Sequence, residues 1–281
     1  MAKKKQEPQY VMSALNTPML NYKVYIMSGR EKITINLIVF LVGGIVGLTF
    51  YGGQFRDVDG IATTATTISN FVVFLLTGIL TNRIYLPIYR QNLCEKRRLH
   101  LTLQFRSFLE ALAVSLSSGM NMTESMISAY NDLKVEYSED AYIVTEVKEI
   151  LKGMQNNIPI EKMLASFGER SQIDDIKNFG IVFDICYRAG GNMKDIVRRT
   201  SNIISEKIEI NEEIQTSLAS NKTQFNAMMC IPIVMMILLR MMSNQFSASF
   251  ATIPGIISIT MAIGIFGISY KLGLKIMNVK G

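Results

Sequence analysis

The chain has 281 residues, of which 49% are hydrophobic, and its mean hydropathy of +0.24 is too high for an ordinary soluble protein of this length. Its formal net charge at pH 7 is +6. The three cysteines are odd in number and far apart, and the chain has a single histidine, so the sequence shows neither a disulfide framework nor the spacing of a metal site. No GxxxxGK[ST] phosphate loop is present. We therefore expect no enzyme activity, no catalytic residue, no metal site and no cofactor.

Long uncharged segments predict four membrane-spanning helices. They are Ile33–Phe50, Ile61–Asn82, Thr223–Leu239 and Met241–Tyr270. A helix needs roughly 20 apolar residues to cross the bilayer, so the first and third need help from flanking polar residues. The alternative, a very hydrophobic soluble core, is disfavoured because a soluble helix keeps a polar face.

The distribution of charge predicts the topology of the chain. Basic residues gather before the first span, just after the second and after the last, whereas basic and acidic residues nearly balance between Arg83 and Lys222. Because basic flanks stay in the cytoplasm, both termini and the long central segment are predicted to be cytoplasmic. The positive charge therefore indicates membrane topology and does not indicate binding to nucleic acid.

The prediction is an all-α, multispan membrane protein with four transmembrane helices and a cytoplasmic six-helix bundle. Its expected parts are a flexible N-terminal lead-in (1–32), a first transmembrane hairpin (33–82), a cytoplasmic helical domain (83–224), a second hairpin (225–273) and a cytoplasmic tail (274–281). Gly43 and Gly47 in the first span form a small-xxx-small pair, which lets two helices approach closely in lipid.

Two joints in the central segment have similar sequences at an offset of 71 residues. Ser118-Gly119-Met120-Asn121 and Ala189-Gly190-Gly191-Asn192 each follow an amphipathic helix that is rich in aromatic residues. Glycine suits the left-handed position after a helix, and asparagine caps the next helix. A bundle of αα-hairpins with the same tight joint used twice is therefore expected.

The sixth helix is predicted to run from Asn192 into the third span without a break, with Pro232 inside it. Ile196, Ile203 and Ile210 lie seven residues apart on it. Such a helix would transmit motion from the cytoplasmic domain to the membrane.

These features resemble the type II secretion system F family, the inner-membrane platform proteins of secretion systems and type IV pili, and more narrowly its single-domain members from tight-adherence (Flp) pilus systems. The resemblance covers about residues 100–270. It rests on the motifs Phe105…Leu109…Leu112…Leu116, Ser118-Gly119, Met126, Glu146, Gly153, Pro159…Leu164, Arg188-Ala-Gly-Gly-Asn192, Glu206 and Ile231-Pro232.

The resemblance implies a platform that docks on a hexameric cytoplasmic secretion ATPase and moves pilin or pseudopilin between the membrane and a fibre. It implies Arg188, Gly190, Gly191 and Asn192 as candidate partner contacts, with Glu146 as a weaker candidate. A homo-oligomer, or pairing with a related platform protein, is also expected. Whether Gly190, Gly191 and Asn192 contact a partner or only shape the turn stays open, and so does the choice between pilus, secretion and DNA uptake.

Two other classes of function are weighed against the platform. A membrane signalling adaptor would need an outer sensor, but the outer loops are about 10 residues long. A small transporter would need a polar path, and the dense polar run Thr63–Asn70 is placed at the outer end of the second span.

Overall fold

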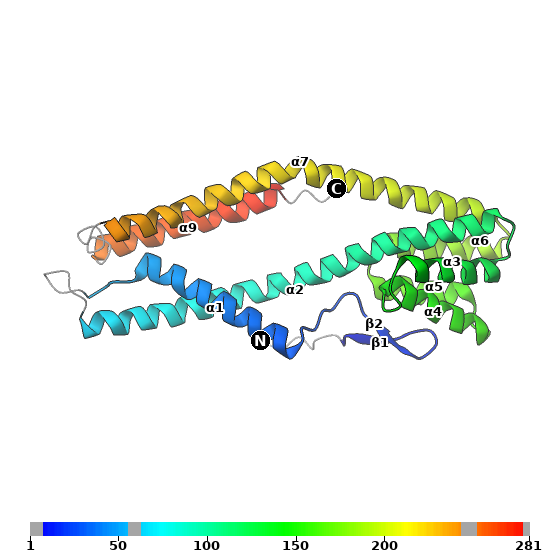
Figure 1. The fold of residues 1–281 in the computed structure, drawn as a ribbon, viewed down its shortest axis with the longest axis horizontal. Coiled ribbons are helices and arrows are strands. Elements are labelled where there is room, and N and C mark those ends of the chain that lie inside the picture. The colour runs from blue at the N-terminus through cyan, green and yellow to red at the C-terminus, as the bar shows by residue number, and fades with distance from the viewer. Residues whose placement is uncertain (1–7, 56–62, 243–251, 278–281) are drawn as a thin grey trace. The chain divides into compact units, whose positions relative to one another are not determined.

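The computed structural model describes residues 8–55, 63–242 and 252–277, and within them the architecture is all-α apart from one short hairpin (Figure 1). The elements in chain order are β1 (Tyr10–Met12), β2 (Pro18–Leu20), α1 (Gly29–Tyr51), α2 (Thr64–Ser117), α3 (Met122–Glu136), α4 (Tyr142–Gln155), α5 (Ile160–Ser171), α6 (Asp174–Arg188), α7 (Met193–Met242) and α9 (Ile253–Met277). Four of the helices are long and apolar enough to cross a membrane: α1, α2, α7 and α9. The predicted fold class is therefore confirmed.

The chain divides into two compact units. We call residues 8–26 together with 90–210 the helical domain, and residues 27–89 together with 211–277 the membrane unit. The helices α2 and α7 each contribute to both units. The two outer turns predicted at 51–60 and 243–252 lie largely outside the described residues.

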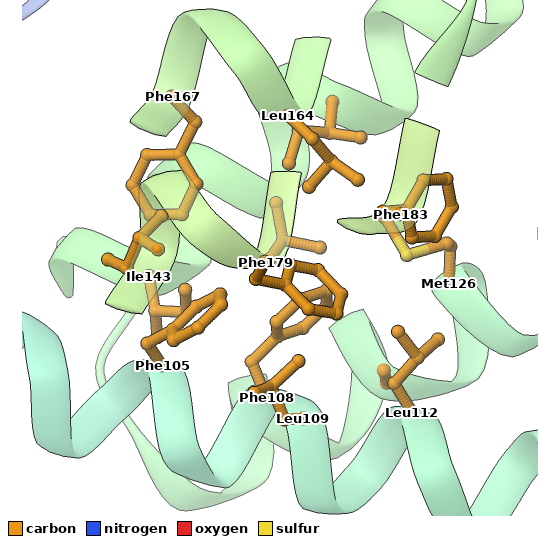
Figure 2. Packing of buried hydrophobic residues seen from close by; sticks show 14 of the residues in the cluster. Phe105, Phe108, Leu109, Leu112, Met126, Ile143, Leu164, Phe167, Phe179 and Phe183 are labelled. Carbon is orange, nitrogen blue, oxygen red and sulfur yellow. The ribbon is translucent and has the colours of Figure 1, made fainter. Parts of the chain in front are cut away.

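The helical domain contains the six predicted helices, namely the C-terminal part of α2, α3 to α6, and the N-terminal part of α7. Its core is one aromatic cluster. The ring of Phe105 lies 5.6 Å from that of Phe179 and 6.1 Å from that of Phe167, both edge-on (Figure 2). Such arrangements are favoured by the quadrupoles of the rings. The predicted stripe on α2 supplies one side of this core, because Leu109 and Leu112 are also fully buried.

Residues 8–26 are not flexible, although the sequence predicted a flexible lead-in over 1–32. β1 and β2 pair antiparallel, and the chain after β2 is held because the Tyr22 N–H donates to the carbonyl of Arg170 at 3.1 Å. Tyr22 itself is buried in the core cluster. We call residues 8–26 the N-terminal strap. The strap packs on the helical domain through contacts with residues more than 100 positions away in sequence, which explains why local sequence patterns did not reveal it.

In the first hairpin of the membrane unit, glycines on α1 let this helix pack closely against α2. A Cβ at Gly43 would lie 2.5 Å from Thr81 Oγ1, and one at Gly47 would overlap Thr77. The hydroxyls of both threonines donate to carbonyls of their own helix at 2.8 Å, so no hydroxyl is left unpaired in the apolar contact. The small-xxx-small pair thus packs α1 against α2 of the same chain.

The second hairpin consists of the C-terminal part of α7 and α9. The rings of Phe225 and Tyr270 stack at 5.9 Å, and Phe225 occupies the space where Gly273 has no side chain. The helix α7 runs unbroken from Met193 to Met242 and contains Pro232, as predicted. On the membrane unit, the Tyr51 hydroxyl of α1 lies 3.1 Å from Thr260 Oγ1 of α9.

Candidate functional site

The joint between α6 and α7 holds four of the five residues that the sequence singled out. Gly190 adopts φ +68°, and the Gly191 N–H donates to the carbonyl of Cys186 at 2.8 Å. This is the six-to-one hydrogen bond of a Schellman motif, in which a glycine in the left-handed region ends the helix. Asn192 then caps α7, because its Oδ1 accepts from the Asp195 N–H at 3.4 Å. The sequence thus folds here into a tight helix–turn–helix joint.

The joint between α2 and α3 has the same backbone. Gly119 adopts φ +87°, and the Met120 N–H donates to the Ser115 carbonyl at 3.3 Å. Asn121 and Glu124 form a reciprocal capping box at the start of α3. The joint similarity read from the sequence therefore corresponds to one local geometry used twice.

The two joints lie at the same end of the helical domain. Thr123, two residues after the first cap, and Tyr187, next to Arg188, line one groove of about 700 Å³. The turn between α4 and α5 contributes Asn157 and Pro159, and residues of α3, α4 and α5 complete the lining. This end of the domain therefore presents a recessed surface beside both turns.

Arg188 is the charged residue of the second joint, and its side chain is 66% exposed. Its Nε donates to Asp184 Oδ1 at 2.6 Å, and its Nη2 lies 4.0 Å from Glu161 Oε1. The same three residues line a second groove, of about 450 Å³, between α5 and α6. Exposed ion pairs contribute little to stability, so the turn does not need this arginine.

Two apolar side chains on α6 extend this surface. Ile181 and Ile185 are exposed and lie one helical turn apart on the wall of the groove between α5 and α6. An exposed apolar pair beside an exposed guanidinium is typical of a surface that contacts protein, with arginine supplying orientation and the aliphatic residues supplying contact area. These isoleucines were not predicted as surface residues, because their spacing matches that of buried residues on the same helix.

Glu146 does not share this exposed surface. Its side chain is 1% exposed and accepts hydrogen bonds from Arg170 Nη1 and Nη2 at 2.8 and 2.7 Å. The Tyr22 hydroxyl of the strap donates to the same carboxylate at 3.1 Å. In the described structure Glu146 therefore organises the interior of the domain, and it is not placed to contact a partner directly.

The pKa values of two acidic groups in this buried cluster are raised. Burial raises the pKa of the Glu146 carboxyl, and the hydrogen bonds from Arg170 oppose that rise. Burial also raises the pKa of Tyr22 well above its ordinary value, with a further rise from the neighbouring Glu146 carboxylate. The Tyr22 phenol therefore stays protonated and keeps donating its hydrogen bond.

A second buried carboxylate fastens the strap. Glu149, one turn after Glu146, accepts hydrogen bonds from the hydroxyls of Ser13 and Thr17, the first at 2.8 Å. Glu149 was not distinguished in the sequence, because nothing local marks a carboxylate whose donors lie more than 130 residues earlier.

The described residues were also searched for a metal site. Among residues 8–55, 63–242 and 252–277, no group of three or more His, Cys, Asp or Glu side chains is arranged to hold a metal ion. The exposed joint combines a rigid turn, one guanidinium flanked by carboxylates and two grooves. The chain thus belongs to the class of all-helical, multispan membrane proteins with a separate helical domain.

The family follows from comparison with known proteins. Residues 108–240, from α2 to α7, match the family model described as Type II secretion system (T2SS), protein F. The chain therefore carries a domain of the type II secretion system protein F family, as the resemblance indicated. No curated protein and no solved structure matches the chain. Family members are inner-membrane platform proteins, not enzymes, that work with a secretion ATPase and pilins in type II secretion and type IV pilus machines.

Proposed function

We propose that this chain is the platform protein of a tight-adherence (Flp) pilus or a related type II secretion-like machine. In this role it couples a hexameric cytoplasmic secretion ATPase to the extraction or assembly of pilin. The observation that carries the proposal is the protein F domain at residues 108–240, which includes both glycine joints and the third span.

The proposed orientation places both termini and the helical domain in the cytoplasm, where an ATPase has access to them. Its support is the lysines and arginines that flank the spans in the sequence. Ser138 is exposed in the turn between α3 and α4. In a variant whose three native cysteines are replaced, Ser138→Cys should resist a membrane-impermeant maleimide in intact cells and react after lysis. Labelling in intact cells would contradict the orientation and the coupling with it.

The proposed contact with the ATPase is the joint Arg188–Asn192. Arg188 is exposed, and the fold does not require it, whereas both glycines have a backbone reason to be there. The test is co-purification of the full chain with the ATPase encoded beside it, together with the ATPase rate. Arg188→Ala should lower retention and stimulation of the ATPase at least tenfold.

Arg106 supplies the matched control. It forms the same type of ion pair with a residue one turn away, Glu110, at 2.7 Å, and its side chain on α2 is 41% exposed. Arg106→Ala should leave ATPase retention unchanged. Equal behaviour of the two variants would reject the joint as the contact.

A substitution at Asn192 can distinguish contact with the ATPase from a role in the turn alone. Asn192→Ser keeps an oxygen that can cap α7 but removes the amide nitrogen, which now donates to Asp195 Oδ2 at 2.6 Å. If the amide contacts the ATPase, Asn192→Ser loses stimulation while its thermal stability stays close to that of the parent. Full activity of this variant would assign Asn192 to the turn alone.

A further inference from the structure

A pocket of about 450 Å³ lies between the two hairpins of the membrane unit. Helix α1 contributes Val46 and Phe50 to its wall, α7 contributes Pro232 and Met236, and α9 contributes side chains between residues 258 and 266. All of these residues belong to helices long and apolar enough to cross the membrane. The volume is in the range of pockets that hold small ligands.

The wall of this pocket is apolar and carries no charge. Among the described residues that line it, Ser258 has the one polar side chain, and its hydroxyl already donates to the Pro254 carbonyl at 2.9 Å. A buried water needs two to four polar partners, and a polar ligand needs groups that fix its orientation. The pocket therefore suits neither water nor a polar ligand.

The pocket is continuous with the surface of the unit that faces lipid. In its wall, Ile259 is 4% exposed, whereas Ile263, one turn further along α9, is 36% exposed. Met261 and Ile265 of the same helix do not line the pocket, and they are 63% and 61% exposed. Because α9 is a membrane-spanning helix, such exposed apolar side chains contact the hydrocarbon of the bilayer. The mouth of the pocket therefore opens into hydrocarbon.

We propose that this pocket binds one acyl chain of a membrane phospholipid. An unfilled space would cost the side chains around it their dispersion contacts, and hydrocarbon is the medium that surrounds them. An acyl chain restores these contacts and places no polar group in an apolar wall. At this level the two hairpins are then joined by a lipid as well as by the contact between Tyr51 and Thr260. This inference rests on the membrane unit alone and does not depend on the proposed platform function.

A photoreactive phospholipid tests the binding. The full chain is placed in phosphatidylcholine nanodiscs that contain a small fraction of phosphatidylcholine with a diazirine in one acyl chain. After illumination, mass spectrometry maps the labelled residues. Ile268 is 64% exposed on α9 and reports contact with ordinary bilayer lipid, whereas the buried Ile259 is reached by a chain inside the pocket. We expect Ile259 to be labelled at least as strongly as Ile268.

Filling the pocket supplies the second test. Ala262 lines the pocket, so Ala262→Phe should lower the ratio of Ile259 to Ile268 labelling at least tenfold, and Ala262→Leu should lower it by a smaller factor. Met261→Phe is the matched control, because it places the same ring on the adjacent residue outside the pocket, and it should leave the ratio unchanged. The melting temperature of each variant shows whether it is folded, and the leucine variant serves if the phenylalanine variant is not.

Three outcomes would overturn the proposal. One is the absence of label at Ile259 while Ile268 is labelled. Another is an equal labelling ratio in the folded Ala262 variants and in Met261→Phe. The third is protection of Ile259 by a polypeptide that co-purifies with the chain, because the pocket would then belong to a protein partner.

Discussion

Arg170 and Glu146 form a two-pronged ion pair inside the helical domain, with both side chains less than one-tenth exposed. The pair joins α5 to α4, and the Tyr22 hydroxyl completes it from the N-terminal strap. Removing two charges from water is costly, and only good geometry and further hydrogen bonds offset that cost. The cluster therefore makes the fold of the domain sensitive to the loss of any one member.

Removing the positive partner is expected to be strongly destabilising. Arg170→Met leaves the Glu146 carboxyl buried without its main hydrogen-bond donors. The expected loss is about 3–5 kcal/mol in the free energy of unfolding. Denaturant unfolding of the full chain in detergent, followed by the signal of the helical domain, measures this loss.

The double variant Arg170→Met with Glu146→Leu is the control for this prediction. It replaces both charges by apolar groups, which is often nearly neutral in a buried pair. We expect it to recover most of the stability lost in the single variant. A double variant as unstable as the single one would show that the loss came from packing and not from the unpaired charge.

Alkaline pH should weaken the domain through Tyr22. Its pKa in the folded chain is raised above its ordinary value of 10.0, so the folded state keeps a proton that the unfolded chain releases. The free energy of unfolding therefore falls as the pH rises above about 10. Tyr22→Phe should cost about 1 kcal/mol at pH 8, for the lost hydrogen bond to Glu146, and should show a shallower decline above pH 10.

The comparison needs unfolding curves of the two proteins at several pH values between 8 and 11. Tyr137 also has a raised pKa, but it is present in both proteins and cancels in the difference. Parallel declines in both proteins would show that Tyr22 does not contribute to the slope.

The first transmembrane hairpin should not tolerate a side chain at Gly47. A Cβ there overlaps Thr77, so Gly47→Ala should force α1 and α2 apart and cost about 1–3 kcal/mol. Gly264→Ala on α9 is the matched control, because nothing lies within 4 Å of its added Cβ. Unfolding in mixed micelles measures both, and equal stabilities would contradict the close packing.

The long helix α7 can be tested as a mechanical connection. Ile204 is fully buried in the core, so a proline there would also unfold the domain. Ser217 is exposed on the same helix. Ser217→Pro should therefore break α7 locally, at a cost of about 3 kcal/mol in helix stability, and leave the core of the domain packed. We expect Ser217→Pro to retain ATPase binding but lose fibre assembly, with Ser217→Ala unaffected. Normal fibres from the proline variant would reject the mechanical role.

The helices and their joints could be predicted because their signals are local. Gly119 and Gly190 end helices in the left-handed conformation that only glycine adopts easily, and the asparagines that follow begin the next helices. The uncharged spans are equally local. These local signals were therefore enough to predict the six-helix domain and the four spans.

The sequence did not predict the features that depend on tertiary contacts, namely the N-terminal strap and the burial of particular side chains on α7. The strands of the strap have only three residues, which is too short for a period of two to show. Nothing in the sequence indicates that Glu146, a candidate partner contact, and Glu149 are buried. On α7, the heptad of isoleucines also proved ambiguous. Ile204 and Val197 are buried, whereas Ile203 is exposed, so adjacent residues of one apparent stripe face different environments.

The N-terminal strap is synthesised before the helices to which it binds. Residues 8–26 leave the ribosome before α1 inserts, yet their anchoring acids belong to α4, which is made more than 100 residues later. Until α4 emerges, the hydroxyls of Tyr22 and Ser13 lack the carboxylates to which they donate in the folded domain. The strap is therefore made first, but it cannot be fastened until α4 and α5 have been made.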